Sequence, residues 1–263
     1  MAFPPERIVC LTEETVETLY LLGQEHRIVG VSGYAVRPAR VRREKPRVSA
    51  FTSADLPKIR ALDPDLVLTF SDLQADIVAD LIRDGIAVHA FNQRDIAGIL
   101  AMIRTLGALT GTADRAEALA RGYEARLAAV AATPRPVRPR VWFEEWDMPL
   151  ISAIGWVSEL IGIAGGQDVF AALAREGRAR DRIVTAGQVA ETAPEVILAS
   201  WCGKKVRPEK IAAREGWGDL PAVRAGRIHE IKSPIILQPG PAALTDGLDA
   251  MLAALWGREG EAA

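Results

Sequence analysis

The sequence predicts an α/β protein of two lobes that one long helix joins. Short apolar runs rich in β-branched residues alternate with helical patterns in the first half of the chain, and the second half repeats this alternation. Between the halves lies an extended helical tract. Strands that alternate with helices are typical of parallel sheets covered by helices. With 263 residues, the chain can bury one large core or two modest ones.

The first lobe is predicted to comprise residues 1–94. Its apolar runs predict strands at residues 8–11, 28–31, 66–70 and 87–91. Apolar residues at helical spacing predict helices at residues 15–22, 56–62 and 73–83. Asp84-Gly85 closes the last of these helices and leads into the next strand.

Residues 95–133 are predicted to form the helix that links the lobes. Apolar side chains recur there at three- and four-residue spacing, as on a helix with one buried stripe. Thr110-Gly111-Thr112 is a point at which the tract can break into two pieces. The prolines at 134, 136 and 139 end it, because proline lacks the amide donor and constrains the residue before it.

The second lobe is predicted to comprise residues 134–263. Strands are predicted at residues 140–143, 196–200 and 228–231, and helices at residues 157–163 and 242–255. One segment of the first lobe, Leu62-Asp63-Pro64-Asp65-Leu66, recurs here as Thr192-Ala193-Pro194-Glu195-Val196. In both, a helix ends before proline and an acidic residue opens a strand. The recurrence indicates two related lobes.

Composition excludes several classes of protein. The chain is 49% hydrophobic and 25% charged with a net charge of −2, so there is no electrostatic reason to expect a nucleic-acid partner. No apolar run approaches the roughly 20 residues of a membrane span, so we expect no membrane insertion. We also expect the protein to be a monomer. Cys10 and Cys202 are too few for a disulfide framework and are interpreted as buried or semi-buried thiols.

The N-terminus shows no charged region, apolar signal core or cleavage site before the first predicted strand. If the chain is native and full-length, this pattern predicts a cytoplasmic protein.

Several segments, in order, resemble the class III substrate-binding proteins of ABC importers. They are residues 7–23, Arg27-Ile28-Val29-Gly30-Val31-Ser32, Lys45-Pro46-Arg47-Val48, residues 59–68, and residues 157–170 with their double glycine. Within that family the sequence is most similar to periplasmic cobalamin-binding proteins. The resemblance implies two Rossmann-like lobes joined by one long interdomain helix, with the ligand in a cleft at the lobe edges. It also implies a periplasmic, non-catalytic protein with a corrinoid as ligand rather than cofactor, and an ABC permease as partner.

Candidate ligand-binding residues come from the loops after the strands, where open α/β sheets bind ligands. Aromatic side chains there supply flat apolar area for a macrocycle, while amides and charges orient its polar periphery. The candidates are Glu13, Glu14, Tyr34, Phe51, Thr52, Phe70, Asp72 and Gln74 in the first lobe, and Glu145, Trp146, Trp201, Lys204 and Gln238 in the second. The resemblance implies an aromatic ligand contact at Phe70 and permease docking at Asp76. We expect Trp146→Ala and Phe70→Ala to weaken binding and to leave the thermal midpoint nearly unchanged.

Other positions depart from the cobalamin binders. Pro149 or Leu150 stands where they carry an aromatic residue, and Pro234 and Gln238 stand where they carry an acid and an arginine. Near Gly187-Gln188, the second docking position, no acid is present, and Glu191 is the nearest. A siderophore or metal-chelate binder therefore stays open as an alternative, as does a cytoplasmic derivative of an importer component.

Structural roles compete with ligand roles at several candidates. Glu13 and Glu14 equally suit the N-terminus of the first helix, where carboxylates are favourable. Trp156 is interpreted as a core anchor, Lys204-Lys205 as a solvated pair open to anion binding, and the charged stretch of residues 175–182 as solvent-facing.

Enzymatic and metal-binding alternatives are weaker. Glu144-Glu145-Trp146-Asp147 suggests a small hydrolase, but strand alternation would send the two adjacent glutamates to opposite faces. Direct zinc or manganese binding needs three or four converging ligands. The histidines are only His26, His89 and His229, and a structural role is favoured for each, so no metal ligand is predicted.

Overall fold

The structure is a computed structural model, and it describes residues 3–257. The chain divides into two compact units. The first comprises Met1–Gln93 and Ala97–Gly122, and the second comprises Arg94–Ile96 and Tyr123–Ala263. The finer assignment of residues 1–94, 95–133 and 134–263 to lobe, linking helix and lobe stays a prediction.

The first unit is built on a five-stranded sheet in the order β3-β2-β1-β4-β5, and every neighbouring pair is parallel. Its strands are β1 (Ile8–Cys10), β2 (Ile28–Ser32), β3 (Arg47–Ser49), β4 (Leu66–Phe70) and β5 (Val88–Phe91). Four of them were predicted. The edge strand β3 was missed because only its central residue, Val48, is buried, which leaves no pattern to detect.

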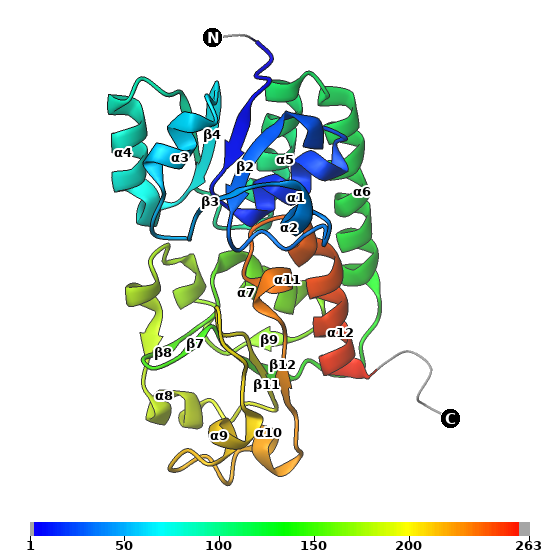
Figure 1. The fold of residues 1–263 in the computed structure, drawn as a ribbon. Helices are drawn as coiled ribbons and strands as arrows, with labels where there is room; N and C mark the ends of the chain where they lie inside the picture. The colour runs from blue at the N-terminus through cyan, green and yellow to red at the C-terminus, as the bar shows by residue number, and fades with distance from the viewer. Residues whose placement is uncertain (1–2, 258–263) are drawn as a thin grey trace. The chain divides into compact units, whose positions relative to one another are not determined.

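Helices cover both faces of this sheet (Figure 1). Helices α3 (Leu56–Ala61) and α4 (Ala75–Arg83) share a core with the strands that includes Leu11, Ile59 and Leu81. Helices α1 (Glu13–Leu21) and α5 (Ile96–Thr110) lie on the other side of the sheet. The remaining short elements are the 3-10 helices η1 (Glu25–Arg27) and η2 (Asp72–Gln74) and the helix α2 (Val41–Glu44).

The tract predicted as one linking helix is two helices, α5 and α6 (Ala113–Ala132). The break lies where it was predicted, because Gly111 adopts a φ of +71° directly after α5. The two helices then pack closely, since a Cβ atom on Gly107 would lie only 2.2 Å from the Cβ of Ala116. Helix α6 spans about 30 Å at 1.5 Å per residue, and it contributes residues to both units.

The main sheet of the second unit has the order β12-β11-β6-β9 and is also parallel. Its strands are β6 (Arg140–Glu144), β9 (Gln167–Asp168), β11 (Val196–Ala199) and β12 (Ile228–Glu230). A core with Trp142, Ile197 and Trp217 joins the sheet to α8 (Ala186–Glu191), α9 (Pro208–Ala212) and α10 (Pro221–Arg224). Helix α7 (Gly155–Ile163) contacts β9, and α12 (Leu248–Trp256) contacts β11.

A small antiparallel sheet, β10-β8-β7, was not predicted. Its strands β7 (Trp146–Asp147), β8 (Leu150–Ile151) and β10 (Ile183–Val184) have two residues each, too few for a sequence pattern. The predicted helix at residues 242–255 is a π-helical turn, Ala243–Gly247, followed by α12. Helix α11 (Ser233–Ile236) and the 3-10 helices η3 (Leu173–Arg175) and η4 (Ala179–Arg182) complete the unit.

Candidate functional site

Each of the two parallel sheets reverses its winding direction at one point. In the first unit β1 lies between β2 and β4, so the reversal falls between β1 and β4. In the second unit β6 lies between β9 and β11, so it falls between β6 and β11. Ligands of open α/β sheets bind outside the carboxyl ends of the strands at such points. The segments after these four strands are therefore the first places to examine for a site.

In the first unit the predicted residues do follow the carboxyl ends of the strands. Glu13 and Glu14 follow β1, Tyr34 follows β2, Phe51 and Thr52 follow β3, and Phe70, Asp72 and Gln74 end or follow β4. Tyr34 is 45% exposed, and Thr52 and Asp72 are also exposed. Phe51 is half-buried. Parallel strands end at the same edge of a sheet, so this edge carries the predicted groups.

Gln74 joins three of these loops. Its Oε1 accepts a hydrogen bond from the amide of Phe70 at 3.0 Å, and its Nε2 donates to the carbonyls of Leu11 (3.3 Å) and Phe51 (2.8 Å). The side chain is fully buried. The prediction of a ligand contact at Gln74 is therefore corrected: its amide is committed to holding the loops in place.

Phe70 is only 5% exposed, so we expect Phe70→Ala to lower the thermal midpoint, in place of the sequence-based expectation that the midpoint stays nearly unchanged. Removing a buried phenyl ring costs about 3–5 kcal/mol of stability.

Glu13 and Glu14 form the first turn of α1, and both are buried. Thr12 donates its hydroxyl to Oε1 of Glu14 at 2.6 Å, while Oε2 of each glutamate has no hydrogen-bond partner within the described part of the chain. Burial raises the pKa of Glu13 to about 7. Burial and the neighbouring charge of Glu13 raise the pKa of Glu14 to about 8. At neutral pH this pair can therefore hold protons.

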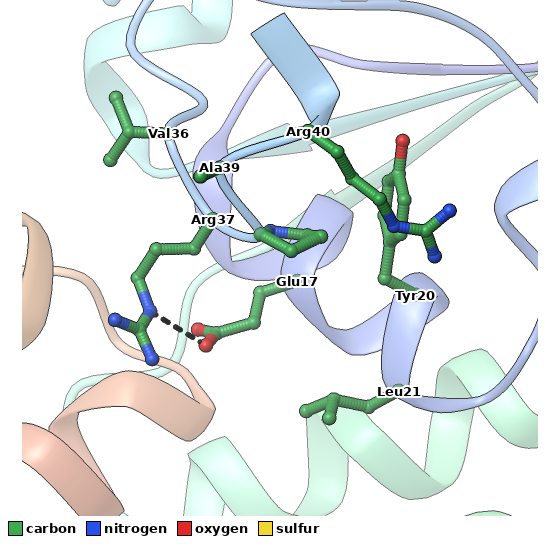
Figure 2. Close-up of a pocket in the computed structure, with 8 residues that line it drawn as sticks. Glu17, Tyr20, Leu21, Val36, Arg37, Ala39 and Arg40 are labelled. Carbon is green, nitrogen blue, oxygen red and sulfur yellow. Dashed lines mark hydrogen bonds and ion pairs between the residues drawn. The ribbon is translucent and has the colours of Figure 1, made fainter. Parts of the chain in front are cut away.

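A pocket of about 450 Å³ lies between α1 and the loop after β2 (Figure 2). Arg37 closes one side through an ion pair with Glu17 at 2.8 Å. The guanidinium of Arg40 lies 4.7 Å from the ring centroid of Tyr20, whose hydroxyl donates to Glu44 at 2.6 Å. The charges around this pocket are thus largely paired with one another.

In the second unit the two adjacent glutamates are bound by arginines. Glu144 is fully buried and accepts from Arg214 (2.5 and 2.8 Å) and from the indoles of Trp142 and Trp201. Glu145 pairs with both terminal nitrogens of Arg182, at 2.7 and 2.9 Å. Arg182 is 1% exposed, so the prediction that all of residues 175–182 face solvent is wrong at this position. Arg182 can be buried because its guanidinium is paired with the carboxylate of Glu145.

Lys204 is held between two indole rings. Its Nζ lies 4.1 Å from the ring centroid of Trp146 and 5.1 Å from that of Trp201, and it pairs with Oδ1 of Asp147 at 2.5 Å. The interpretation of Lys204-Lys205 as a merely solvated pair is therefore incomplete for Lys204. The sequence carried no signal for this cluster, because β7 and the loop after β11 meet only in the folded unit.

The remaining sequence interpretations have mixed outcomes. Trp156 is a core residue, 2% exposed, and donates to the carbonyl of Ile236 at 2.8 Å. Gln238 is half-buried in the segment after α11. Cys10 is buried as expected, but Cys202 is exposed in the loop after β11, so the interpretation as a buried or semi-buried thiol is wrong for Cys202. Among residues 3–257, no three His, Cys, Asp or Glu side chains are grouped so that they could hold a metal ion.

The family model described as periplasmic binding protein matches residues 8–235. The chain belongs to the periplasmic binding protein family. A vitamin B12-binding protein of Vibrio parahaemolyticus is 25% identical over 245 residues, which are 92% of this chain and 86% of that protein. A cobalamin-binding protein of Halobacterium salinarum is 30% identical over 172 residues, which are 64% of this chain and 47% of that protein.

Solved structures of periplasmic binding proteins share the fold. The periplasmic vitamin B12 binding protein BtuF of Vibrio cholerae has a TM-score of 0.76 at 23% identity, covering 97% of this chain and 98% of that one. The periplasmic heme-binding protein RhuT from Roseiflexus sp. RS-1 has a TM-score of 0.78 at 25% identity, covering 95% and 98%. The predicted fold class and family are confirmed.

Periplasmic binding proteins of this family are solute-binding components of ABC importers and are not enzymes. The carboxylates that suggested a hydrolase are all in ion pairs: Glu144 and Glu145 with arginines, and Asp147 with Lys204. No helix within residues 3–257 is long and apolar enough to cross a bilayer.

Proposed function

We propose that the protein binds cobalamin or a related corrinoid and serves as the substrate-binding component of an ABC importer. The observation that carries the proposal is the similarity to a vitamin B12-binding protein along 92% of the chain. Aromatic residues at the carboxyl edges of the sheets support it. Phe51 and Trp146 are partly exposed and offer flat apolar surface of the kind that a corrin ring contacts, whereas Trp201 is only 4% exposed.

The proposed ligand contacts are the residues of the two carboxyl edges other than Gln74. They are Glu13, Glu14, Tyr34, Phe51, Thr52, Phe70 and Asp72 in the first unit, and Glu145, Trp146, Trp201, Lys204 and Gln238 in the second. Asp76, exposed in the first turn of α4, is the proposed permease contact. Glu191, the exposed last residue of α8, is the nearest acid to the second docking position.

Titration of the purified protein with cyanocobalamin and dicyanocobinamide, followed by tryptophan fluorescence, tests the proposal. Saturable binding at micromolar or tighter affinity, about −8 kcal/mol, is expected. The absence of a saturable signal with both corrinoids would remove cobalamin as the ligand.

A haem or iron chelate is the second candidate. Its support is the 25% identity to a heme-binding protein over nearly the whole chain and the lysines of the second unit, which suit an anionic periphery. Titration with haemin and with a ferric siderophore, monitored by absorbance, separates this candidate from the first.

A further inference from the structure

A pocket of about 270 Å³ opens at the carboxyl ends of β11 and β12, which are neighbours in the sheet of the second unit. Two loops line it. The first follows β11, and the second continues from the end of β12. The lining residues are Trp201, Gly203, Lys204, Lys205, Glu230, Ile231, Lys232, Ser233 and Pro234.

Lys204, one of the lining lysines, is already held in position by neighbouring side chains. The ammonium of Lys204 is attracted to the faces of Trp146 and Trp201 and is paired with Asp147. An ammonium has three donors, and the ion pair with Asp147 engages one oxygen acceptor. A cation already held in place costs a ligand less ordering entropy than a freely rotating side chain.

The charges around the pocket favour an anion. Lys204, Lys205 and Lys232 face two carboxylates, Asp147 and Glu230, which leaves one positive charge in excess. Lys232 pairs with Oε2 of Glu230 at 2.6 Å, and Oε1 of that glutamate accepts from the amide of Val206 at 3.1 Å. Within the described part of the chain Lys205 has no ion pair.

We propose that this pocket binds an anionic group, a carboxylate or a phosphate, of the solute that the protein carries. The inference rests on the proposed function in that it gives the solute an anionic substituent. Lysine ammoniums act on such groups as point charges, so either oxyanion suits them. The pocket is smaller than the roughly 300–1,000 Å³ of sites that enclose a whole ligand, so it fits one substituent rather than a tetrapyrrole ring.

Two simple anions serve as probes of anion binding in the pocket, so the solute itself need not be identified. The full chain is titrated with pyrophosphate and with tricarballylate at constant ionic strength, and the tryptophan fluorescence is read, because Trp201 lines the pocket. We expect saturable binding of at least one anion, weakened roughly tenfold by Lys205→Gln and by Lys232→Gln. Lys210→Gln, at an exposed position of α9 outside the pocket, is the matched control and should bind as wild type.

A preference for pyrophosphate indicates a phosphate, and a preference for tricarballylate a carboxylate. No saturable signal with either anion, or equal affinity in wild type and both pocket variants, would overturn the inference. If anion binding saturates and depends on both lysines while the corrinoids do not bind, the proposed ligand is wrong and the pocket stands. Corrinoid binding without lysine-dependent anion binding would support the proposed ligand and contradict anion binding in this pocket.

Discussion

Arg7 and Arg140 occupy equivalent positions in the two units and make the same hydrogen bonds. Nε of Arg7 donates to the carbonyls of Leu62 and Asp63, and Nε of Arg140 donates to those of Thr192 and Ala193. The amide of Arg7 donates to Asp65, and that of Arg140 to Glu195. The segment that recurs in the sequence thus also recurs in the structure. In each unit an arginine at or directly before the first strand (β1 or β6) binds the end of the helix (α3 or α8) that precedes the neighbouring strand in the sheet (β4 or β11).

Removal of either arginine side chain should destabilise its own unit. We expect Arg140→Met to lower the free energy of unfolding by about 1–2 kcal/mol, because carbonyls at the helix end lose charged donors that water only partly replaces. Arg180→Met, at an exposed position with a longer 3.8 Å ion pair, is the control. Urea denaturation measures both. Equal stability of Arg140→Met and wild type would contradict the structural role.

The repeated turn also stores backbone strain. Asp63 and Ala193 adopt φ angles of +45° and +44°, a region that costs a residue with a Cβ about 1–2 kcal/mol. Ala193→Gly relieves that cost and adds about 0.4–1 kcal/mol of unfolded-state entropy, so we expect a net gain of roughly 0.5 kcal/mol. Ala190→Gly within α8 should instead destabilise by about 1 kcal/mol. A loss of stability in Ala193→Gly would contradict the assigned backbone conformation.

The buried pair of Glu144 and Arg214 should be essential for the second unit. Arg214→Met leaves a fully buried carboxylate with only two indole donors, so we expect a loss of about 3–5 kcal/mol. Arg224→Met breaks an ion pair in which both side chains are exposed, and it should cost less than about 1 kcal/mol. Thermal unfolding compares the two variants, and similar midpoints would show that the Glu144 pair is not critical.

Stability should fall as pH rises, because of Glu13 and Glu14. Their folded-state pKa values are about 7 and about 8, whereas an unfolded glutamate titrates near 4.3. Between about pH 4.3 and pH 8 these two glutamates bind more protons in the folded chain than in the unfolded chain. Their contribution to the free energy of unfolding therefore decreases as pH rises, up to about pH 8.

The double variant Glu13→Gln/Glu14→Gln should flatten this dependence and raise stability at pH 8 by at least about 1 kcal/mol relative to wild type. Glu209→Gln, exposed on α9, should keep the wild-type slope. Denaturation series at pH 5 to 8.5 measure the slopes. A double variant with the wild-type slope would show that neither carboxyl has a raised pKa.

Periodicity and β-branched runs predicted the strands of both parallel sheets that exceed three residues, together with α1, α3, α4, α7 and α12. The short helices α8, α9 and α10 of the second unit were not predicted, because four to six residues are too few to show a helical period. The loops that carry the candidate site were predictable for the same reason, since they follow from the strand ends. Partners were not. Arg182 and Arg214 are distant in sequence from Glu145 and Glu144, and only the folded chain reveals that these pairs are bidentate. The two-residue strands around Trp146 carry no pattern, so the environment of Lys204 was unpredictable.

We propose that this periplasmic binding protein binds a corrinoid and that Trp146 contacts it. The most direct measurement is calorimetric titration of wild type and Trp146→Ala with cyanocobalamin, with haemin titrated in parallel. We predict saturable one-to-one binding of cyanocobalamin by wild type at micromolar or tighter affinity, and binding weakened at least roughly tenfold in the variant, about 1.4 kcal/mol. Binding of haemin alone, or equal corrinoid affinity in both proteins, would contradict the claim.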